Sequence, residues 1–233
     1  MNHQVTQRGS STRSKKGSSV PPKTKTLSDK AYEQIKDRLV SAKYVPGQFL
    51  QEAQICADLK LGRTPVHQAL HRLQQEGLVE IIPRKGILVK SDSLSEIFLA
   101  LEVRALVEPY CAALCAEKAT EADINALRDL LDQYDAKRES ANKSKLMEMD
   151  RRLHTMIAEI AGNHLLAHFL KPIHERMSRI WFLPHWQFHD FGLTGSEHGA
   201  LFEAIERRDA QGASTAMKEH VESLRRRIIE AAS

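Results

Sequence analysis

The chain has 233 residues, 42% of them hydrophobic, which is enough for one or two domains with apolar cores. No run approaches the ~18 apolar residues of a membrane helix, and the first residues lack a signal-peptide core, so we expect a cytoplasmic protein without membrane contact. The net charge of +4 is uneven: residues 1–91 carry 16 Lys/Arg against 7 Asp/Glu, and residues 92–233 carry 18 against 23. The basic half predicts a polyanionic partner.

Residues 1–26 are rich in Ser, Thr, Lys, Gly and Pro, with six basic residues and no acidic one. They offer almost nothing to bury, so we expect a disordered tail. Two roles stay open for this tail: a solvated segment, or a basic arm that adds contacts to phosphates.

Residues 27–91 are expected to form a winged helix-turn-helix domain of three helices and a small hairpin. Apolar residues at four-residue steps mark a first helix from Ser28 that stops before a turn signal at residues 45–47. A second, short helix follows at residues 52–59. Two β-favouring runs around residues 83–86 predict the hairpin.

The third helix, expected over residues 65–76, has one apolar and one polar side. Pro65 begins it, because proline at the first helical position loses no hydrogen bond, and Gly77 ends it. Its buried stripe is expected to be Val66, Ala69, Leu70 and Leu73. In a helix-turn-helix this helix enters the major groove, where Gln68 can pair with adenine and Arg63 with guanine or a phosphate.

The hairpin cations would lie over the minor groove or the DNA backbone. The residues that we assign to the DNA-binding surface are Arg63, Thr64, His67, Gln68, His71 and Arg72 around the third helix, and Arg84, Lys85 and Gly86 in the hairpin.

Residues 92–233 predict an acidic, all-α bundle of about six helices, so the fold class is mainly α. The expected helices are 93–118, 121–138, 144–162, 164–181, 195–207 and 210–231, with an irregular loop at 181–195. Thr120 and Asp209 are expected N-caps, and Gly162 with Asn163 is expected to stop a helix.

The stretch GRTPVHQALHRLQQEGLV (residues 62–79), followed by PRKGILV, resembles the DNA-binding domain of GntR-family bacterial transcription regulators. It keeps twelve positions of the family pattern S-R-T-P-V-R-E-A-L-x-R-L-x-x-E-G-L-V. It departs from that pattern at Gly62 for Ser, His67 for Arg and Gln68 for Glu. Because relatives use the arginine at position 67 on DNA, this departure implies a different operator or weaker base-specific binding.

Eleven histidines are present, and eight of them lie beyond residue 150. Asp150 and His154 stand at i and i+4, so both point to one side of a helix and can chelate one ion. His198 lies on the inward stripe of a later helix, and His220 lies on the last one. The other histidines, His3, His164, His168, His174, His185 and His189, are expected to be surface or packing residues.

This half resembles the FadR C-terminal domain (FCD), the helical ligand-sensing bundle of one GntR subfamily. Its metal-binding members use a D-x-x-x-H pair followed by two histidines on the last helices, and Asp150, His154, His198 and His220 match this pattern. The resemblance implies a divalent transition metal, Zn²⁺, Ni²⁺ or Mn²⁺ with Zn²⁺ favoured, and free coordination positions for water or a ligand.

Arg104 lies on the same helical stripe as Ile97, Leu101 and Glu108, so its guanidinium is directed toward an apolar interior, where an unpaired charge is costly. One explanation is an i, i+4 ion pair with Glu108. The other is a bidentate clamp on a carboxylate effector, which the family's E-x-R residues, here Glu102 to Arg104, favour.

The resemblance to the GntR family implies a dimeric regulator, a repressor as most relatives are, that binds duplex operator DNA and responds to a small organic acid. We do not expect an enzyme. Two alternatives stay open: a metal-dependent hydrolase or isomerase in which the metal activates water, and a metal sensor without an organic effector. No clear general base accompanies the four ligands, which disfavours the enzyme.

The three cysteines, Cys56, Cys111 and Cys115, are odd in number and lack metal-knuckle spacing. We therefore expect buried, small apolar residues rather than disulfides.

Overall fold

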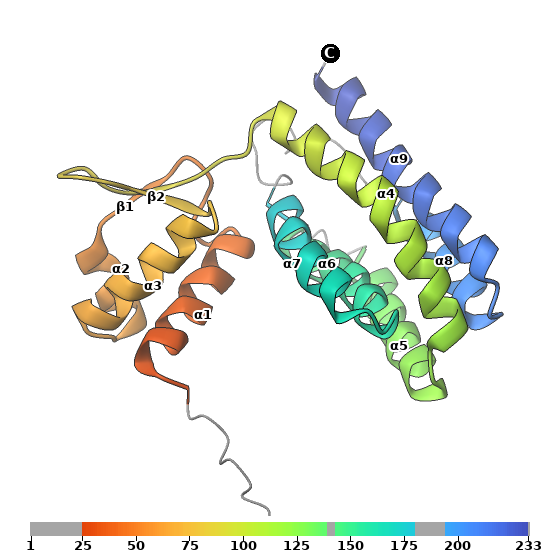
Figure 1. The fold of residues 1–233 in the computed structure, drawn as a ribbon. Helices are drawn as coiled ribbons and strands as arrows, with labels where there is room; N and C mark the ends of the chain where they lie inside the picture. Colours follow the sequence, from red (N-terminus) through yellow and green to blue (C-terminus); the bar gives the residue numbers. More distant parts are fainter. Residues whose placement is uncertain (1–24, 139–142, 180–193, 233) are drawn as a thin grey trace, which may run out of the picture.

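The computed structural model describes residues 25–138, 143–179 and 194–232. Most of the expected N-terminal tail, most of the expected loop at 181–195, and His3, His185 and His189 lie outside these residues. Figure 1 shows three helices with a small sheet joined by an extended segment to a bundle of helices. This is the mainly α architecture that the sequence predicts.

The first unit combines three helices with an antiparallel sheet in the order β1-β3-β2. Its elements are α1 (Leu27–Val40), β1 (Phe49–Leu50), α2 (Glu52–Leu59), α3 (Arg63–Gln75), β2 (Val79–Ile82) and β3 (Gly86–Val89). Ile35 of α1 and Leu70 and Leu73 of α3 are at most 1% exposed in the core between these helices. The apolar stripe expected for the third helix is confirmed.

Two details of this unit differ from the prediction. The sequence predicts a two-stranded hairpin, but β1 adds a third strand, with Phe49 opposite Leu88 of β3. Two residues are too few to show a period-two pattern. Helix α3 begins at Arg63, before Pro65; because the first four N–H groups of a helix have no partner within it, proline at the third position loses no hydrogen bond either.

The second unit is a bundle in which α4 runs beside α9 and α8, with α5, α6 and α7 on its other side (Figure 1). Its elements are α4 (Leu94–Lys118), α5 (Glu121–Arg138), α6 (Lys143–Ile160), α7 (His164–Met177), α8 (Thr194–Glu206) and α9 (Ala210–Ala232). The Thr120 hydroxyl accepts from the Asp123 N–H at 3.2 Å, and Asp209 accepts from the Gly212 N–H at 2.8 Å, which confirms both N-caps. None of the described helices is long and apolar enough to span a bilayer.

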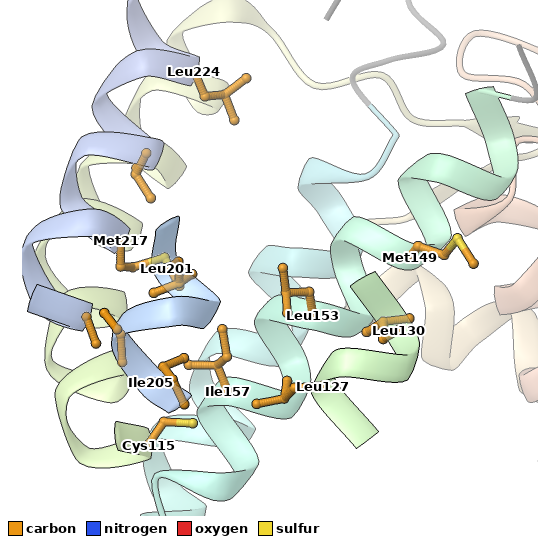
Figure 2. Packing of buried hydrophobic residues seen from close by; sticks show 14 of the residues in the cluster. Cys115, Leu127, Leu130, Met149, Leu153, Ile157, Leu201, Ile205, Met217 and Leu224 are labelled. Atoms are coloured by element: carbon orange, nitrogen blue, oxygen red, sulfur yellow. The ribbon is translucent and has the colours of Figure 1, made fainter. Parts of the chain in front are cut away.

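Apolar side chains from all six helices of the bundle contribute to its core, and Figure 2 shows part of this packing. The view labels Cys115 from α4, Leu127 from α5, Ile157 from α6, Ile205 from α8 and Met217 from α9. Cys111 and Cys115 are buried, as expected, and Cys56 is partly buried.

Ion pairs on α7 and directly after it contact the first unit and the connecting segment. Lys36 Nζ of α1 lies 2.7 Å from Glu175 Oε2 of α7. Asp92, in the connecting segment, pairs with Arg176 and, at 3.1 Å, with Arg179 Nη2. Arg179 Nη1 also donates to the Lys90 carbonyl oxygen at 3.2 Å. Helix α7 therefore contacts both the first unit and the segment that leads into the bundle.

Gly86 begins β3 with φ +115°, and a Cβ at this position would lie 2.5 Å from the Leu50 carbonyl oxygen. We expect Gly86→Ala to lower the free energy of unfolding by about 1–3 kcal/mol, measured by urea denaturation of the full chain. The control is Gly62→Ser, because Gly62 has φ −68° and is an N-cap without a side-chain hydrogen bond. Serine can cap α3 and should add a few tenths of a kcal/mol. An unchanged stability of Gly86→Ala would contradict the close approach of β1 to the hairpin.

Candidate functional site

Helix α3 exposes the polar face that the sequence predicts. His67, Gln68 and His71 are exposed, while Val66, Ala69, Leu70 and Leu73 are buried. Arg63 and Thr64 are exposed at the N-terminal end of the helix, and Arg84 and Lys85 are exposed in the turn between β2 and β3. The polar face of α3 and the β2–β3 turn are therefore both accessible to a binding partner.

Some residues of this face are held by other side chains. His67 Nδ1 lies 3.2 Å from Glu52 Oε2 of α2, and the His67 and His71 Nε2 atoms are 3.1 Å apart. Arg72 donates to Asp29 of α1 at 2.9 Å and stacks over the Tyr32 ring at 4.0 Å. Arg72 therefore braces α3 against α1, a role that the sequence-based analysis did not predict.

The four predicted metal ligands come together inside the bundle. Asp150 and His154 lie on α6, His198 on α8 and His220 on α9, and one ligand atom from each lies within 4.8 Å of the others. His198 Nε2 is 3.2 Å from Asp150 Oδ1, and His154 Nε2 is 3.8 Å from the same oxygen. The three histidines are at most 2% exposed.

The environment keeps this cluster ready to donate electron pairs. Burial lowers the pKa of His154, and it lowers the pKa of His220 to about 4 despite the hydrogen bond to Glu197. Burial alone would raise the pKa of Asp150, but His198 and the other imidazoles hold it well below its usual range. One ionised carboxylate and neutral imidazoles are the forms that bind metal.

His198 supplies a test of fit for a metal ion. Its ring is fully buried, and neither ring nitrogen makes a well-directed hydrogen bond within the described part of the chain. A buried polar atom without a partner is costly. One carboxylate and three imidazoles would satisfy a four-ligand ion such as Zn²⁺, with room for a further ligand in an expanded shell. The residues present therefore fit a divalent transition metal.

A second polar network lies beside this cluster, on the other side of His154. Glu108 Oε1 is 2.5 Å from Arg104 Nε and 2.9 Å from His174 Nε2, and Glu108 Oε2 is 2.7 Å from His154 Nδ1. Burial alone would raise the pKa of Glu108, but Arg104 and the two imidazoles lower it well below the usual range. The i, i+4 ion pair considered for Arg104 is present in the structure.

His174 was expected to be a surface or packing residue, but it is 3% exposed and belongs to this network. Its position 66 residues beyond Glu108 leaves no spacing signal for the contact. His164 and His168 are exposed. Glu108, Glu197 and His174 are thus polar neighbours of the cluster that the sequence-based analysis did not identify.

A winged helix-turn-helix unit followed by an all-helical bundle is an architecture typical of DNA-binding transcription regulators. The model of the bacterial regulatory proteins of the gntR family matches residues 27–89, and the FCD domain model matches residues 99–223. The chain therefore belongs to the GntR family of transcription regulators and carries an FCD domain.

Similar proteins agree with this assignment. The Nta operon transcriptional regulator of Aminobacter aminovorans is 30% identical over 59% of this chain and 65% of its own length. The Uxu operon transcriptional regulator of Escherichia coli is 28% identical over 89% of this chain and 90% of its own. The solved structure of E. coli McbR/YncC has a TM-score of 0.81 at 18% identity, covering 90% of this chain and 100% of that one. Both relatives are named as transcription regulators, and the likeness to McbR/YncC shows a shared fold.

The Arg104–Glu108 pair gives a test of stability. We expect Glu108→Leu to lower the free energy of unfolding by about 3–5 kcal/mol, because it leaves a buried guanidinium unpaired, and Arg104→Met/Glu108→Leu to cost less. Urea denaturation measures both changes.

The matched control is the exposed i, i+4 pair Arg207–Glu203, with an N–O distance of 3.6 Å. Glu203→Leu should change stability by less than about 1 kcal/mol. If Arg104→Met/Glu108→Leu were no more stable than Glu108→Leu, the unpaired guanidinium of Arg104 would not explain the loss of stability in Glu108→Leu.

Proposed function

We propose that this protein is a dimeric repressor that binds operator DNA through α3 and the β2–β3 turn, and that a metal ion and a small organic acid in the bundle control its affinity. The observation that carries the proposal is the convergence of Asp150, His154, His198 and His220 in the interior of the FCD domain. One relative is named the galactonate operon transcriptional repressor of Escherichia coli, at 27% identity over 83% of this chain. Its name supports repression and an operon concerned with an acid.

In this proposal Arg63 and Gln68 contact base edges at the N-terminal end of α3, where side chains reach the major groove. His67, His71 and Thr64 add contacts on the same exposed face. The cations of the hairpin turn hold the DNA backbone. Gly86 contributes by its backbone conformation, because its φ of +115° shapes this turn. A repressor that binds operator DNA would act in the cytoplasm.

The proposed metal is Zn²⁺, with Ni²⁺ and Mn²⁺ as alternatives. Three imidazoles and one carboxylate suit Zn²⁺, and the absence of thiolates from the cluster is compatible with all three ions. When bound, the ion would supply a Lewis acid that attracts a carboxylate or hydroxyl of the effector. The four side chains hold that ion between α6, α8 and α9.

Arg104 is the proposed partner for the effector's other end. Its Nε and Nη2 atoms contact Glu108, and Nη2 also lies 3.2 Å from His154 Nε2. A guanidinium has five N–H donors, so it can bind an acid while it keeps part of its pairing with Glu108. An acid that draws Arg104 away from Glu108 would alter the network that includes His174.

Helix α7 provides a route from this network to the DNA-binding unit. His174 faces Glu108, and the next residue, Glu175, pairs with Lys36 of α1. A shift of α7 would change both contacts, and it would also change the pairing of Arg176 and Arg179 with Asp92. We infer that the effector acts by favouring one of two positions of α7, which alters the spacing of the two DNA-reading units.

The dimer is proposed to form through α4. Leu99, Leu106 and Tyr110 are 60%, 74% and 57% exposed, and they follow one another at helical spacing. A stripe of large apolar side chains on one face of a helix is typical of an interface. Analytical ultracentrifugation that gives the mass of one chain at micromolar concentration would contradict this assignment.

Two variants separate the DNA surface from the sensing site. Arg63→Ala should weaken operator binding about 10- to 100-fold, because it removes a groove contact, while its metal content stays unchanged. His198→Ala should lose the metal and the response to acids but keep basal DNA binding. Gel shifts with the neighbouring genomic DNA, together with elemental analysis, measure both.

Unchanged operator affinity of Arg63→Ala would overturn the groove assignment. Titration of organic acids into the same gel shift distinguishes the proposal from a metal sensor. If chelation and metal reconstitution alone changed DNA affinity, and no acid did, the metal-sensor alternative would replace the organic effector.

The α7 route predicts a specific uncoupling. Glu175→Gln removes the charge that pairs α7 with Lys36 and leaves the Asp92 pairs in place, and we expect it to reduce by at least about threefold the ratio of operator affinities with and without metal. Glu76→Gln is the control, because Glu76 pairs with the same Lys36 Nζ at 2.9 Å within the first unit. An unchanged ratio for Glu175→Gln would remove α7 from the route.

A further inference from the structure

Two of the proposed metal ligands, His154 and His220, each contact a carboxylate that is not itself a proposed ligand. His154 Nδ1 is 2.7 Å from Glu108, and His220 Nδ1 is 2.9 Å from Glu197 Oε2. Histidines that bind metals usually donate their other ring N–H to such a group, which fixes the tautomer and the orientation of the ring. The two contacts therefore act on the proposed ligands His154 and His220.

The first of these carboxylates does not form a second metal site. Glu108, His154 and His174 have ligand atoms within 4.8 Å of one another. However, the guanidinium of Arg104 already contacts both Glu108 and His154 in this space. A resident cation beside Glu108 would repel a divalent ion. Glu108 is better explained as the partner that neutralises Arg104 and orients His154.

The second carboxylate, Glu197, contacts three side chains of a single helix, α9. Besides His220, Glu197 Oε1 accepts from the Ser223 hydroxyl at 2.6 Å, and Arg227 Nη1 and Nη2 lie 3.4 Å from the carboxylate. These three partners stand on α9 at steps of three and four residues, so they share one face of that helix. The face holds the carboxylate in one orientation against His220.

The position of Glu197 also links two ligands through the chain. It precedes His198 on α8, so adjacent residues supply one ligand directly and orient another across the α8–α9 contact. Because a carboxylate has only acceptors, His220 Nδ1 must carry the proton of their hydrogen bond. The lone pair then resides on Nε2, the nitrogen that remains for the metal.

We propose that Glu197 is a positioning residue of the metal centre, which holds His220 in the Nδ1–H tautomer so that Nε2 is preset to bind the ion. This inference rests on the proposed metal-binding function. It goes beyond the four ligands, because Glu197 itself does not have to touch the ion.

The location of Glu197 makes the proposal testable without disrupting the core. Its side chain is 24% exposed and borders a surface pocket of about 500 Å³, together with His220, Ser223 and Arg226. Glu197→Gln keeps the volume and an acceptor oxygen, and Glu197→Ala removes both. The control is Glu203→Ala, because Glu203 lies on the same helix with its side chain 65% exposed.

The first measurement is the Zn²⁺ affinity of the full-length protein, determined by competition with a chromophoric chelator. We expect Glu197→Ala to bind Zn²⁺ about 10- to 100-fold more weakly, Glu197→Gln to show an intermediate loss, and Glu203→Ala to match the wild type. Circular dichroism checks that each variant is folded. If Glu197→Ala does not fold, Glu197→Gln carries the comparison.

The second measurement is the tautomer of His220 in metal-free protein, from the ¹⁵N chemical shifts of the histidine rings. We expect the Nδ1–H form in the wild type and a mixture of tautomers in Glu197→Ala. A purely structural role would not change the tautomer. Wild-type protein that binds no transition metal would overturn the proposed function. Wild-type protein that binds Zn²⁺, with equal affinity or an equal tautomer population in Glu197→Ala, would overturn only this inference.

Discussion

The imidazole of His154 lies between the buried carboxylate of Glu108 and the partly buried carboxylate of Asp150, and the polar interior of the bundle depends on this arrangement. Its Nδ1 is 2.7 Å from Glu108, and its Nε2 is 3.8 Å from Asp150. A neutral imidazole has one donor and one acceptor nitrogen. The contact with Glu108 therefore leaves Nε2 as the acceptor on the side of the predicted metal ligands. Because Arg104 neutralises Glu108, the bundle can bury this donor set without an unpaired charge on that side.

The Glu108 carboxylate also contacts α7, through His174. Adjacent residues of a helix point about 100° apart, so His174 can face Glu108 in the bundle while Glu175 faces Lys36 of the first unit. The connecting segment is held by the same helix through the pair of Asp92 with Arg176. A rotation of α7 would therefore change its contacts with Glu108 in the bundle, with Asp92 in the connecting segment and with Lys36 in α1. Such coupling uses packed elements that can occupy discrete positions.

Periodicity predicted most of the fold, and the resemblance to the FCD domain, together with the Asp150–His154 spacing, predicted the four candidate ligands. The apolar stripe of α3 and the i, i+4 pair of Asp150 and His154 are local patterns, and a helix converts them directly into a shared face. The contact between Glu175 and Lys36 joins residues far apart in the chain, so no local pattern reports it. The same limit explains why His174 and the short strand β1 were missed, since both depend on tertiary contacts.

The buried thiols of α4 have a consequence for the chemistry of the bundle. Burial raises the pKa of Cys111 to about 11 and that of Cys115 to about 12. Both sulfurs therefore stay protonated at neutral pH, and the thiolate is the form that oxidants and soft metals attack. Oxidation and copper(I) binding are therefore disfavoured at these two positions compared with an exposed cysteine.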